Sequence, residues 1–243
     1  SGRAANEEKL LEEKSQEELK RLAAEVRAKK LAEAEKTGAK RDAGKKVTNN
    51  GLKGQWTEPQ TGIVWHYEIN NGMATILRIE TPSQFDGHVS VPEYIDGNFV
   101  TCIRGLSPNV VSLSVPEGVG CLGGTSVPWL PRLEALSLPA SWRDGKSFDI
   151  LDPSLKTVTI NPSNEDFTVS GGLVCDKGMR RVVFCPGGAE EVVLPEDVED
   201  VTKLFRYTGK LRSIRVASGN SRFEARDGVL YDKTLTELVC WPE

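Results

Sequence analysis

Two short stretches decide the fold: Val110-Val-Ser-Leu-Ser-Val-Pro116 and Leu133-Glu-Ala-Leu-Ser-Leu-Pro139. Each has an apolar residue, two spaces, a second apolar residue, one space, a third apolar residue and then Pro. An alternation of this kind predicts a short strand with one face buried, which the Pro ends.

Four further copies of this pattern occur in the chain. They are centred near Val89, Val158, Val192 and Ile214. The second apolar position therefore falls at residues 89, 113, 136, 158, 192 and 214, in steps of 24, 23, 22, 34 and 22. Repeats of this length cannot bury an apolar face alone, but they can do so by stacking on their neighbours. The pattern predicts a solenoid with one parallel sheet and one continuous core, with strands near 89–91, 113–115, 136–138, 158–160, 192–194 and 214–216.

A longer duplication explains the irregular step of 34. Residues 155–187 align without gaps on 211–243, at a constant offset of 56. The step of 34 is then one repeat unit that carries an insert, Gly172–Pro186, which we predict to be a two-stranded β-hairpin around Asp176-Lys-Gly178. Its copy, Gly228–Pro242, predicts a second hairpin at the end of the chain.

The charge distribution separates an arm from this repeat domain. Residues 1–46 hold 13 Lys/Arg and 10 Asp/Glu, whereas the remaining 197 residues hold 18 Lys/Arg and 25 Asp/Glu together with all 13 Pro. The arm is rich in good helix formers, so we predict a charged α-helix. Its weak apolar stripe leaves two alternatives open, a solvated single helix and a short coiled coil or docking helix that self-associates through residues 6–36. We interpret 47–62 as a linker and 63–243 as a leucine-rich-repeat domain.

The composition bounds the possible functions. The net charge of −4 gives no electrostatic reason to expect nucleic-acid binding, and no apolar run is long enough to span a membrane. His66 and His88 are the only histidines, and no Cys-x-x-Cys pair accompanies them. We therefore expect no metal, no cofactor and no enzymatic activity. The stretch Gly118-Val-Gly-Cys-Leu-Gly123 matches a dinucleotide-binding motif, but two prolines follow it closely, so a solenoid turn is the better interpretation.

The five cysteines are odd in number and lie in apolar surroundings. Buried free thiols are the simplest interpretation, and a bridge between Cys175 and Cys185 within the inserted hairpin is the alternative.

Several phrases of this domain resemble those of the BspA-like (Treponema-type) leucine-rich-repeat proteins. The resemblance rests on the lead-in from Tyr67 to Ile103, on Phe205-Arg-Tyr-Thr-Gly-Lys-Leu211 and on Asn220-Ser-Arg-Phe223 followed by Asp227–Lys233. It implies a bacterial protein at an extracellular, cell-surface or periplasmic location that binds other macromolecules, although this sequence shows no signal peptide.

Side chains between the inward positions point outward and form the expected binding face. With the resemblance, they predict a non-enzymatic binding or adhesion module that recognises a protein or glycan. A structural or assembly protein, tethered or oligomerised by its arm, is the alternative. The expected binding residues are His88, Ser112, Ser114, Ser137, Thr157, Thr159, Ser213 and Arg215.

Overall fold

The computed structural model describes residues 51–123, 130–143, 154–204 and 209–242. The chain divides into two units, Ser1–Val47 and Thr48–Glu243, and the described residues all belong to the second. The charged arm lies outside the described residues, so its helix stays a prediction.

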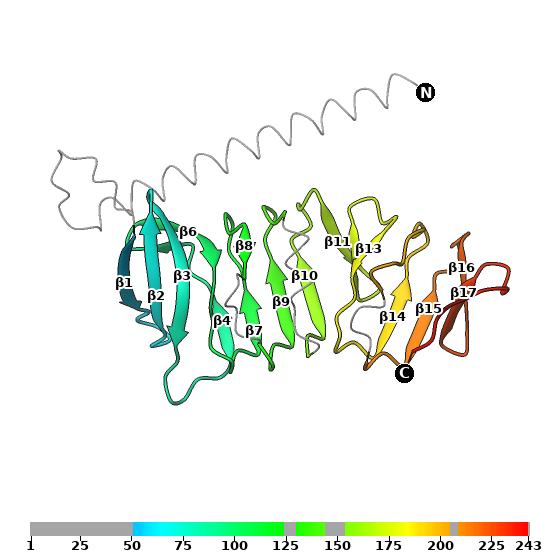
Figure 1. Cartoon of the computed structure of the whole chain (residues 1–243), viewed down its shortest axis with the longest axis horizontal. Helices are drawn as coiled ribbons and strands as arrows, with labels where there is room; N and C mark the ends of the chain where they lie inside the picture. The colour runs from blue at the N-terminus through cyan, green and yellow to red at the C-terminus, as the bar shows by residue number, and fades with distance from the viewer. Residues whose placement is uncertain (1–50, 124–129, 144–153, 205–208, 243) are drawn as a thin grey trace, which may run out of the picture. The chain divides into compact units, whose positions relative to one another are not determined.

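Four of the expected repeat strands form one parallel sheet (Figure 1). Its order is β10-β9-β7-β4, and the strands are β4 (His88–Ser90), β7 (Ser112–Ser114), β9 (Ala135–Leu138) and β10 (Thr157–Ile160). Each lies within one residue of the predicted range. The middle apolar residues, such as Leu113 and Leu136, are 1–2% exposed and pair in register across the sheet. The period-two alternation was therefore a sound guide to which side chains enter the core.

The remaining two repeat strands form a separate parallel pair, β14 (Glu191–Leu194) with β15 (Ser213–Val216). The prediction of one continuous sheet is wrong, because the inserted hairpin stands between β10 and β14 in the row of strands (Figure 1). The turn at Gly171 of this hairpin lies against β14, where the backbone N–H of Val193 donates to the Gly171 carbonyl at 2.8 Å.

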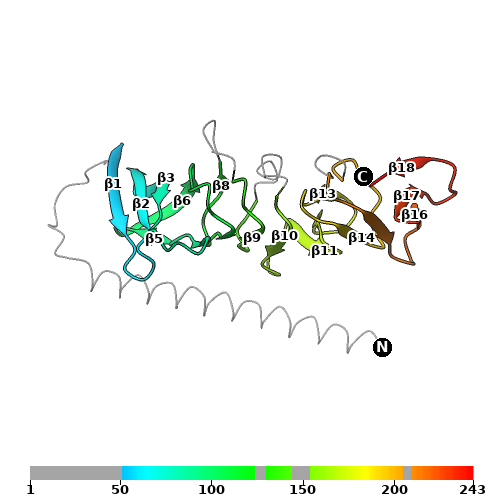
Figure 2. The same cartoon turned by 90° about the horizontal axis from the view of Figure 1, so that it is seen from below.

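Both predicted hairpins are present, and each has a third strand that the sequence interpretation missed. The inserted sheet has the order β11-β12-β13 and the terminal one β16-β17-β18, all antiparallel. Their strands are β11 (Phe167–Ser170), β12 (Leu173–Asp176), β13 (Val182–Phe184), β16 (Phe223–Arg226), β17 (Val229–Asp232) and β18 (Leu238–Cys240). Figure 1 shows the terminal sheet following β14 and β15, and Figure 2 shows its strand β18 beside β16 and β17.

The repeat domain opens with a mixed sheet of six strands, in the order β1-β2-β3-β6-β5 with β8 beside β6. The strands are β1 (Leu52–Thr57), β2 (Val64–Asn70), β3 (Met73–Glu80), β5 (Tyr94–Ile95), β6 (Asn98–Ile103) and β8 (Cys121–Leu122). Strand β8 lies within the Gly118–Gly123 stretch, so the last part of this stretch is itself a strand.

Strand β1 corrects the interpretation of 47–62 as a linker. Leu52–Thr57 pairs with β2 over its full length, and Trp56 lies opposite Trp65. Gly54 allows the close approach, because a Cβ atom there would collide with the Tyr67 hydroxyl group on β2. The glycines that we took as a sign of flexibility thus include one that a strand requires.

The apolar core consists of two clusters, which corrects the expectation of one continuous core. Strand β12 separates them. Val174 belongs to the first cluster, whereas Leu173 and Cys175 belong to the second, and all three are 0% exposed. Successive side chains of a strand point to opposite faces, so one strand can serve both cores.

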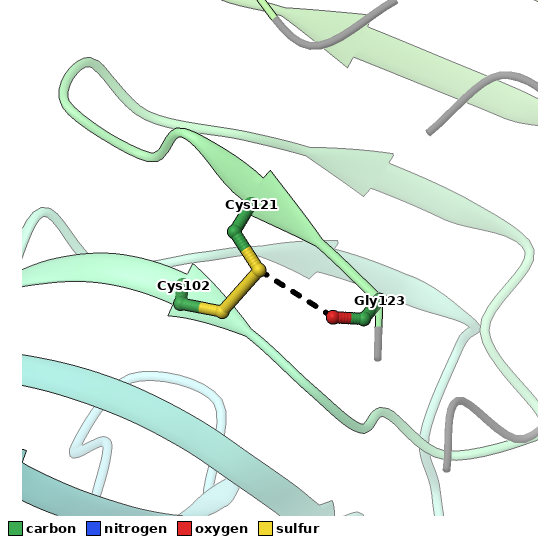
Figure 3. The surroundings of a disulfide bond; sticks show 3 residues. All are labelled: Cys102, Cys121 and Gly123. Carbon is green, nitrogen blue, oxygen red and sulfur yellow. Dashed lines mark hydrogen bonds between the residues drawn. A yellow bond between two sulfur atoms is a disulfide. The ribbon is translucent and has the colours of Figure 1, made fainter. Parts of the chain in front are cut away.

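The cysteines divide into one bonded pair and three thiols. Cys102 on β6 and Cys121 on β8 are register partners with a Cα–Cα distance of 4.6 Å and form a disulfide (Figure 3). Cys175, Cys185 and Cys240 are free and buried, so the alternative Cys175–Cys185 bridge is wrong. Burial raises the pKa of the Cys175 and Cys240 thiols to about 11 and, with Cys240 nearby, that of Cys185 to about 12. All three therefore remain protonated at neutral pH.

Among the described residues, no helix has the length and apolar character needed to cross a membrane.

Candidate functional site

The predicted binding residues form two straight columns on the four-stranded sheet. Strand pairing aligns His88, Ser112, Ala135 and Thr157 in one column, and Ser90, Ser114, Ser137 and Thr159 in the other. All are exposed except Ser112 and Ala135, which are half-buried. The register brings together six of the eight predicted residues: His88, Ser112, Ser114, Ser137, Thr157 and Thr159.

Ser213 and Arg215 do not join these columns. They lie on β15 in the separate two-stranded sheet, beyond the inserted hairpin. Arg215 was the one predicted residue of a type that often dominates binding energies. Its Nη2 lies 3.7 Å from Oε2 of Glu191 on β14, and both side chains are mostly exposed. The guanidinium charge is therefore locally balanced at the surface.

A groove of about 500 Å³ lies at the β4 end of the columns, and we call it the β4 groove. Its floor includes the predicted residues His88, Ser112 and Ser114. Its other lining residues are Gln60, Thr61, Ile63, Pro82, Gln84, Phe85, Asp86, Val89 and Ser90.

Sequence reasoning missed the walls of this groove. Gln60 and Thr61 come from the turn between β1 and β2, inside the segment taken as a linker, and 82–86 come from the loop between β3 and β4. The loop is shaped locally: Phe85 N–H donates to the Pro82 carbonyl at 3.1 Å, and His88 N–H donates to Asp86 Oδ1 at 2.9 Å. No repeat pattern marks these residues, because each segment occurs once.

A second groove of about 400 Å³ lies at the carboxyl ends of β7, β9 and β10, where Ser137 and Thr159 take part in its lining. Two of its polar side chains, Glu117 and Asn161, are engaged within the protein. The Glu117 carboxylate accepts the backbone N–H groups of Ala140 and Ser141 at 2.8 and 2.9 Å. Burial alone would raise the pKa of Glu117, but these bonds and one from the Ser141 hydroxyl group outweigh it and lower the pKa. Asn161 Oδ1 accepts the Ser163 N–H at 3.0 Å.

The two histidines lie on different sheets. His66 on β2 has its Nε2 3.0 Å from Glu80 Oε1, and Arg78 Nη1 lies 2.6 Å from the same oxygen. His88 is on β4. Within the described ranges, no three His, Cys, Asp or Glu side chains come close enough to hold a metal ion.

Comparisons with known proteins add a likeness in fold. No family model matches this chain, and no curated protein matches it significantly. The crystal structure of the pneumococcal vaccine antigen PcpA is similar at 18% identity and a TM-score of 0.35, covering 80% of this chain and 57% of that chain. A leucine-rich repeat protein from Eubacterium ventriosum ATCC 27560 is similar at 12% identity and a TM-score of 0.30, covering 70% of this chain and 62% of that one. This chain thus spans less than two thirds of the length of either structure.

Together, the stacked parallel strands and their outward polar columns define the described part of the chain as a β-solenoid. Likenesses at this level carry no conclusion about a particular family or ligand.

Proposed function

We propose that this chain is a non-enzymatic recognition module that binds a macromolecule through the exposed face of its four-stranded sheet. One observation carries the proposal: eight side chains on four strands form two columns in register, and seven of them are Ser, Thr or His. Hydroxyl and imidazole groups both donate and accept hydrogen bonds, so such a face can pair with a polar ligand without burying a charge.

The short side chains of this face also support binding. Ser and Thr are short, so a partner can approach the sheet closely along both columns. Short side chains also lose little conformational entropy when a ligand orders them. Adhesion to a protein or a glycan would use the face in this way, and the resemblance to BspA-like proteins favours the same role.

We also propose an extracellular, cell-surface or periplasmic location. The Cys102–Cys121 disulfide supports it, because such bonds persist in oxidising compartments and are rare in the cytosol. The three remaining thiols are buried, which is compatible with an oxidising compartment because buried thiols react slowly.

The test is to obstruct the face at its centre. We would screen the protein against a panel of purified glycans and extracellular proteins, and then compare two double variants that carry the same added charge. Ser137→Arg with Thr159→Arg places two long side chains in one column, and Ser218→Arg with Ser221→Arg places them on exposed turn residues before β16. Ligands should bind the second variant normally and the first at least tenfold more weakly. Equal binding by both variants would show that the face is not the site.

A second proposal, from a different class, concerns the arm. Residues 6–36 would oligomerise or tether the solenoid, which the helix-forming composition and the unit boundary at Val47 favour. Light scattering of the full chain and of a chain starting at Thr48 tests it. A larger assembly from the full chain alone supports the proposal, and equal monomeric masses contradict it.

A further inference from the structure

The β4 groove contains several polar side chains that are not engaged within the protein. Within the described part of the chain, the side chains of Gln60, Gln84, Ser90, Ser112 and Ser114 make no hydrogen bond to protein. In the second groove, oxygens of Glu117 and Asn161 already accept backbone N–H groups, which leaves the hydroxyl groups of Ser137 and Thr159. The β4 groove therefore offers two primary amides and three hydroxyl groups to a ligand, each able to donate and to accept.

The charge of the groove is low. Asp86 is the only carboxylate among the lining residues that the structure describes, and one of its oxygens already accepts the His88 N–H. No Lys or Arg is among the described lining residues. An anionic ligand would meet no fixed cation, and a cationic ligand would meet one partly engaged carboxylate. The groove therefore favours a neutral ligand.

One wall of the groove is apolar. Phe85 is half-buried and packs against the core, and Pro82 lies beside it along the loop. The Phe85 ring is therefore held in place while part of it remains accessible. A fixed ring next to hydroxyl and amide groups suits a molecule with hydroxyl groups on its rim and C–H groups on its face.

We propose that the β4 groove binds one or two rings of a neutral sugar. This inference rests on the proposed function, since it names the ligand class for one end of the same face. A volume of about 500 Å³ falls in the range of small-molecule sites, and it is too small for a folded protein surface to enter. The sugar hydroxyl groups would pair with the Gln and Ser side chains, and the C–H face would lie against Phe85.

An extended peptide is the competing ligand, because β4 is the edge strand of its sheet. Strand addition depends on a run of free backbone N–H and C=O groups. β4 has three residues, and the N–H of His88 is already bonded to Asp86. The edge therefore offers little backbone, whereas the groove offers five free polar side chains, which favours the sugar.

The experiment is a titration of the ¹⁵N-labelled full chain, followed by amide shifts. The probes are four neutral disaccharides (lactose, cellobiose, maltose and N,N′-diacetylchitobiose), the anionic trisaccharide sialyllactose, and an unbiased set of capped octapeptides. We expect at least one neutral disaccharide to shift amides of the turn at 60–61, of the loop at 82–86 and of Ser90. Gln84→Ala should weaken its affinity about five- to tenfold, the loss of one net hydrogen bond.

Matched variants separate this inference from the general proposal. Ser114→Trp fills the groove and should abolish disaccharide shifts, whereas Thr159→Trp lies in the same column, outside the groove, and should leave them intact. Both positions are exposed, so neither substitution should prevent folding.

Each outcome has a defined meaning. Sugar binding that maps to Ser137 and Thr159 would overturn the groove assignment but keep the binding face. If octapeptides shift the amide signals of the groove and no disaccharide does, the ligand class is a peptide and the sugar proposal is wrong. A preference for sialyllactose would overturn the neutral class. If no disaccharide shifts the amide signals of the groove while the sheet face binds larger partners, the inference is wrong and the proposed function is retained.

Discussion

The two three-stranded hairpins, Phe167–Phe184 and Phe223–Cys240, share their strand pairing but not their surroundings. Their registers agree at the offset of 56 residues, so that Phe167 pairs with Asp176 and Phe223 with Asp232. The middle strand of the inserted hairpin is buried on both faces, with Leu173, Val174 and Cys175 all at 0% exposure. In the terminal hairpin the equivalent residues are Val229, Leu230 and Tyr231, and of these only Leu230 is buried.

The neighbours on the outer side account for this difference. Residues 180–182 at the start of β13 are bonded to the next repeat unit, where Val182 N–H donates to the Asp200 carbonyl at 2.9 Å. The equivalent of Val182 is Leu238, which is 51% exposed, and Trp241 close by is 71% exposed. The same supersecondary unit thus acts as a partition in one place and as a surface in another. How much each side chain contributes to stability therefore depends on the repeat units that pack against it.

The largest expected effect comes from the partition strand. Leu173→Ala should lower the free energy of unfolding by roughly 2–5 kcal/mol, because it opens a cavity in the second core. Val229→Ala, at the half-buried equivalent position, should cost less than about 1 kcal/mol. Urea denaturation measures both. Leu230→Ala is the matched control, since Leu230 is also 0% exposed, and it should fall in the larger range. Similar small costs for Leu173 and Val229 would contradict the role of β12 as a partition.

The second-largest expected effect on stability concerns the turns between the first two strands of each hairpin. Gly171-Gly172 has φ values of 58° and 82°, and Asp227-Gly228 has 52° and 80°, so both turns are left-handed at both central positions. A Cβ atom at Gly171 would collide with the Val193 carbonyl oxygen of the next repeat strand.

Exchanging these residues between the two turns should therefore have unequal results. Gly171→Asp should destabilise by about 2–4 kcal/mol, through the clash and the strained φ. Asp227→Gly should be within about 1 kcal/mol of neutral, because the left-handed φ already suits glycine. Thermal unfolding of both variants provides the comparison. A Gly171→Asp protein as stable as the parent would mean that the turn and β14 are not packed closely.

A third measurement tests what the two hairpins share. Before each of them, a buried Asn joins the hairpin to the preceding repeat unit. Asn164 Nδ2 donates to the Pro139 and Trp142 carbonyls at 3.2 and 2.8 Å, and its Oδ1 accepts the Asp166 and Phe167 N–H groups. Asn220 repeats this arrangement with the Pro195 and Val198 carbonyls at 2.8 and 3.0 Å and with the next N–H groups.

Asn164→Ala and Asn220→Ala should each cost about 1–3 kcal/mol, because buried backbone groups lose their partners. The exposed Asn161, which makes one local bond to Ser163, provides the control, and Asn161→Ala should cost less than about 1 kcal/mol. Chemical denaturation checks all three variants. If Asn164→Ala were as mild as Asn161→Ala, this shared hydrogen-bond network would not stabilise the repeat.

The smallest effect concerns a surface ion pair of the terminal hairpin. Lys233 Nζ lies 2.9 Å from Glu224 Oε2, whereas the equivalent Lys177 donates to the Pro162 carbonyl. Exposed pairs of this kind contribute little and are screened by salt. Lys233→Ala should leave the melting temperature unchanged within error at high salt and lower it only slightly at low salt. A marked loss at high salt would show that Lys233 has a packing role.

The fold was largely predictable because its strands follow a period of two. The predicted bounds of the six repeat strands lie within one residue of the observed bounds. Each strand has apolar residues at alternate positions, and these are the residues that enter the core. The additional strands of the hairpins, Phe167–Ser170 and Phe223–Arg226, were missed because each has only four residues and precedes the segment to which the two-stranded hairpin was assigned. Strand β1 was missed because Gly54 resembles a linker residue, although the Tyr67 side chain on the next strand requires it.

The candidate site was predictable only in part. The two columns follow from the alternation along each strand and from the constant repeat step. The β4 groove also needs Gln60, Gln84 and Phe85, whose segments carry no repeat signal and come together through local turns. The Cys102–Cys121 disulfide had no sequence signature either, because its two cysteines become neighbours only through the parallel pairing of β6 with β8 in the six-stranded sheet.

The sequence by itself determined the repeat step, the inward and outward faces and the two hairpins, because these depend on apolar periodicity and on turn residues close together along the chain. The tertiary structure alone decided that the sheet is interrupted at Gly171, that β12 divides the core in two, and that the groove forms at β4. These features arise where segments distant in sequence meet. The fit of one surface against another is not encoded in the local pattern of either.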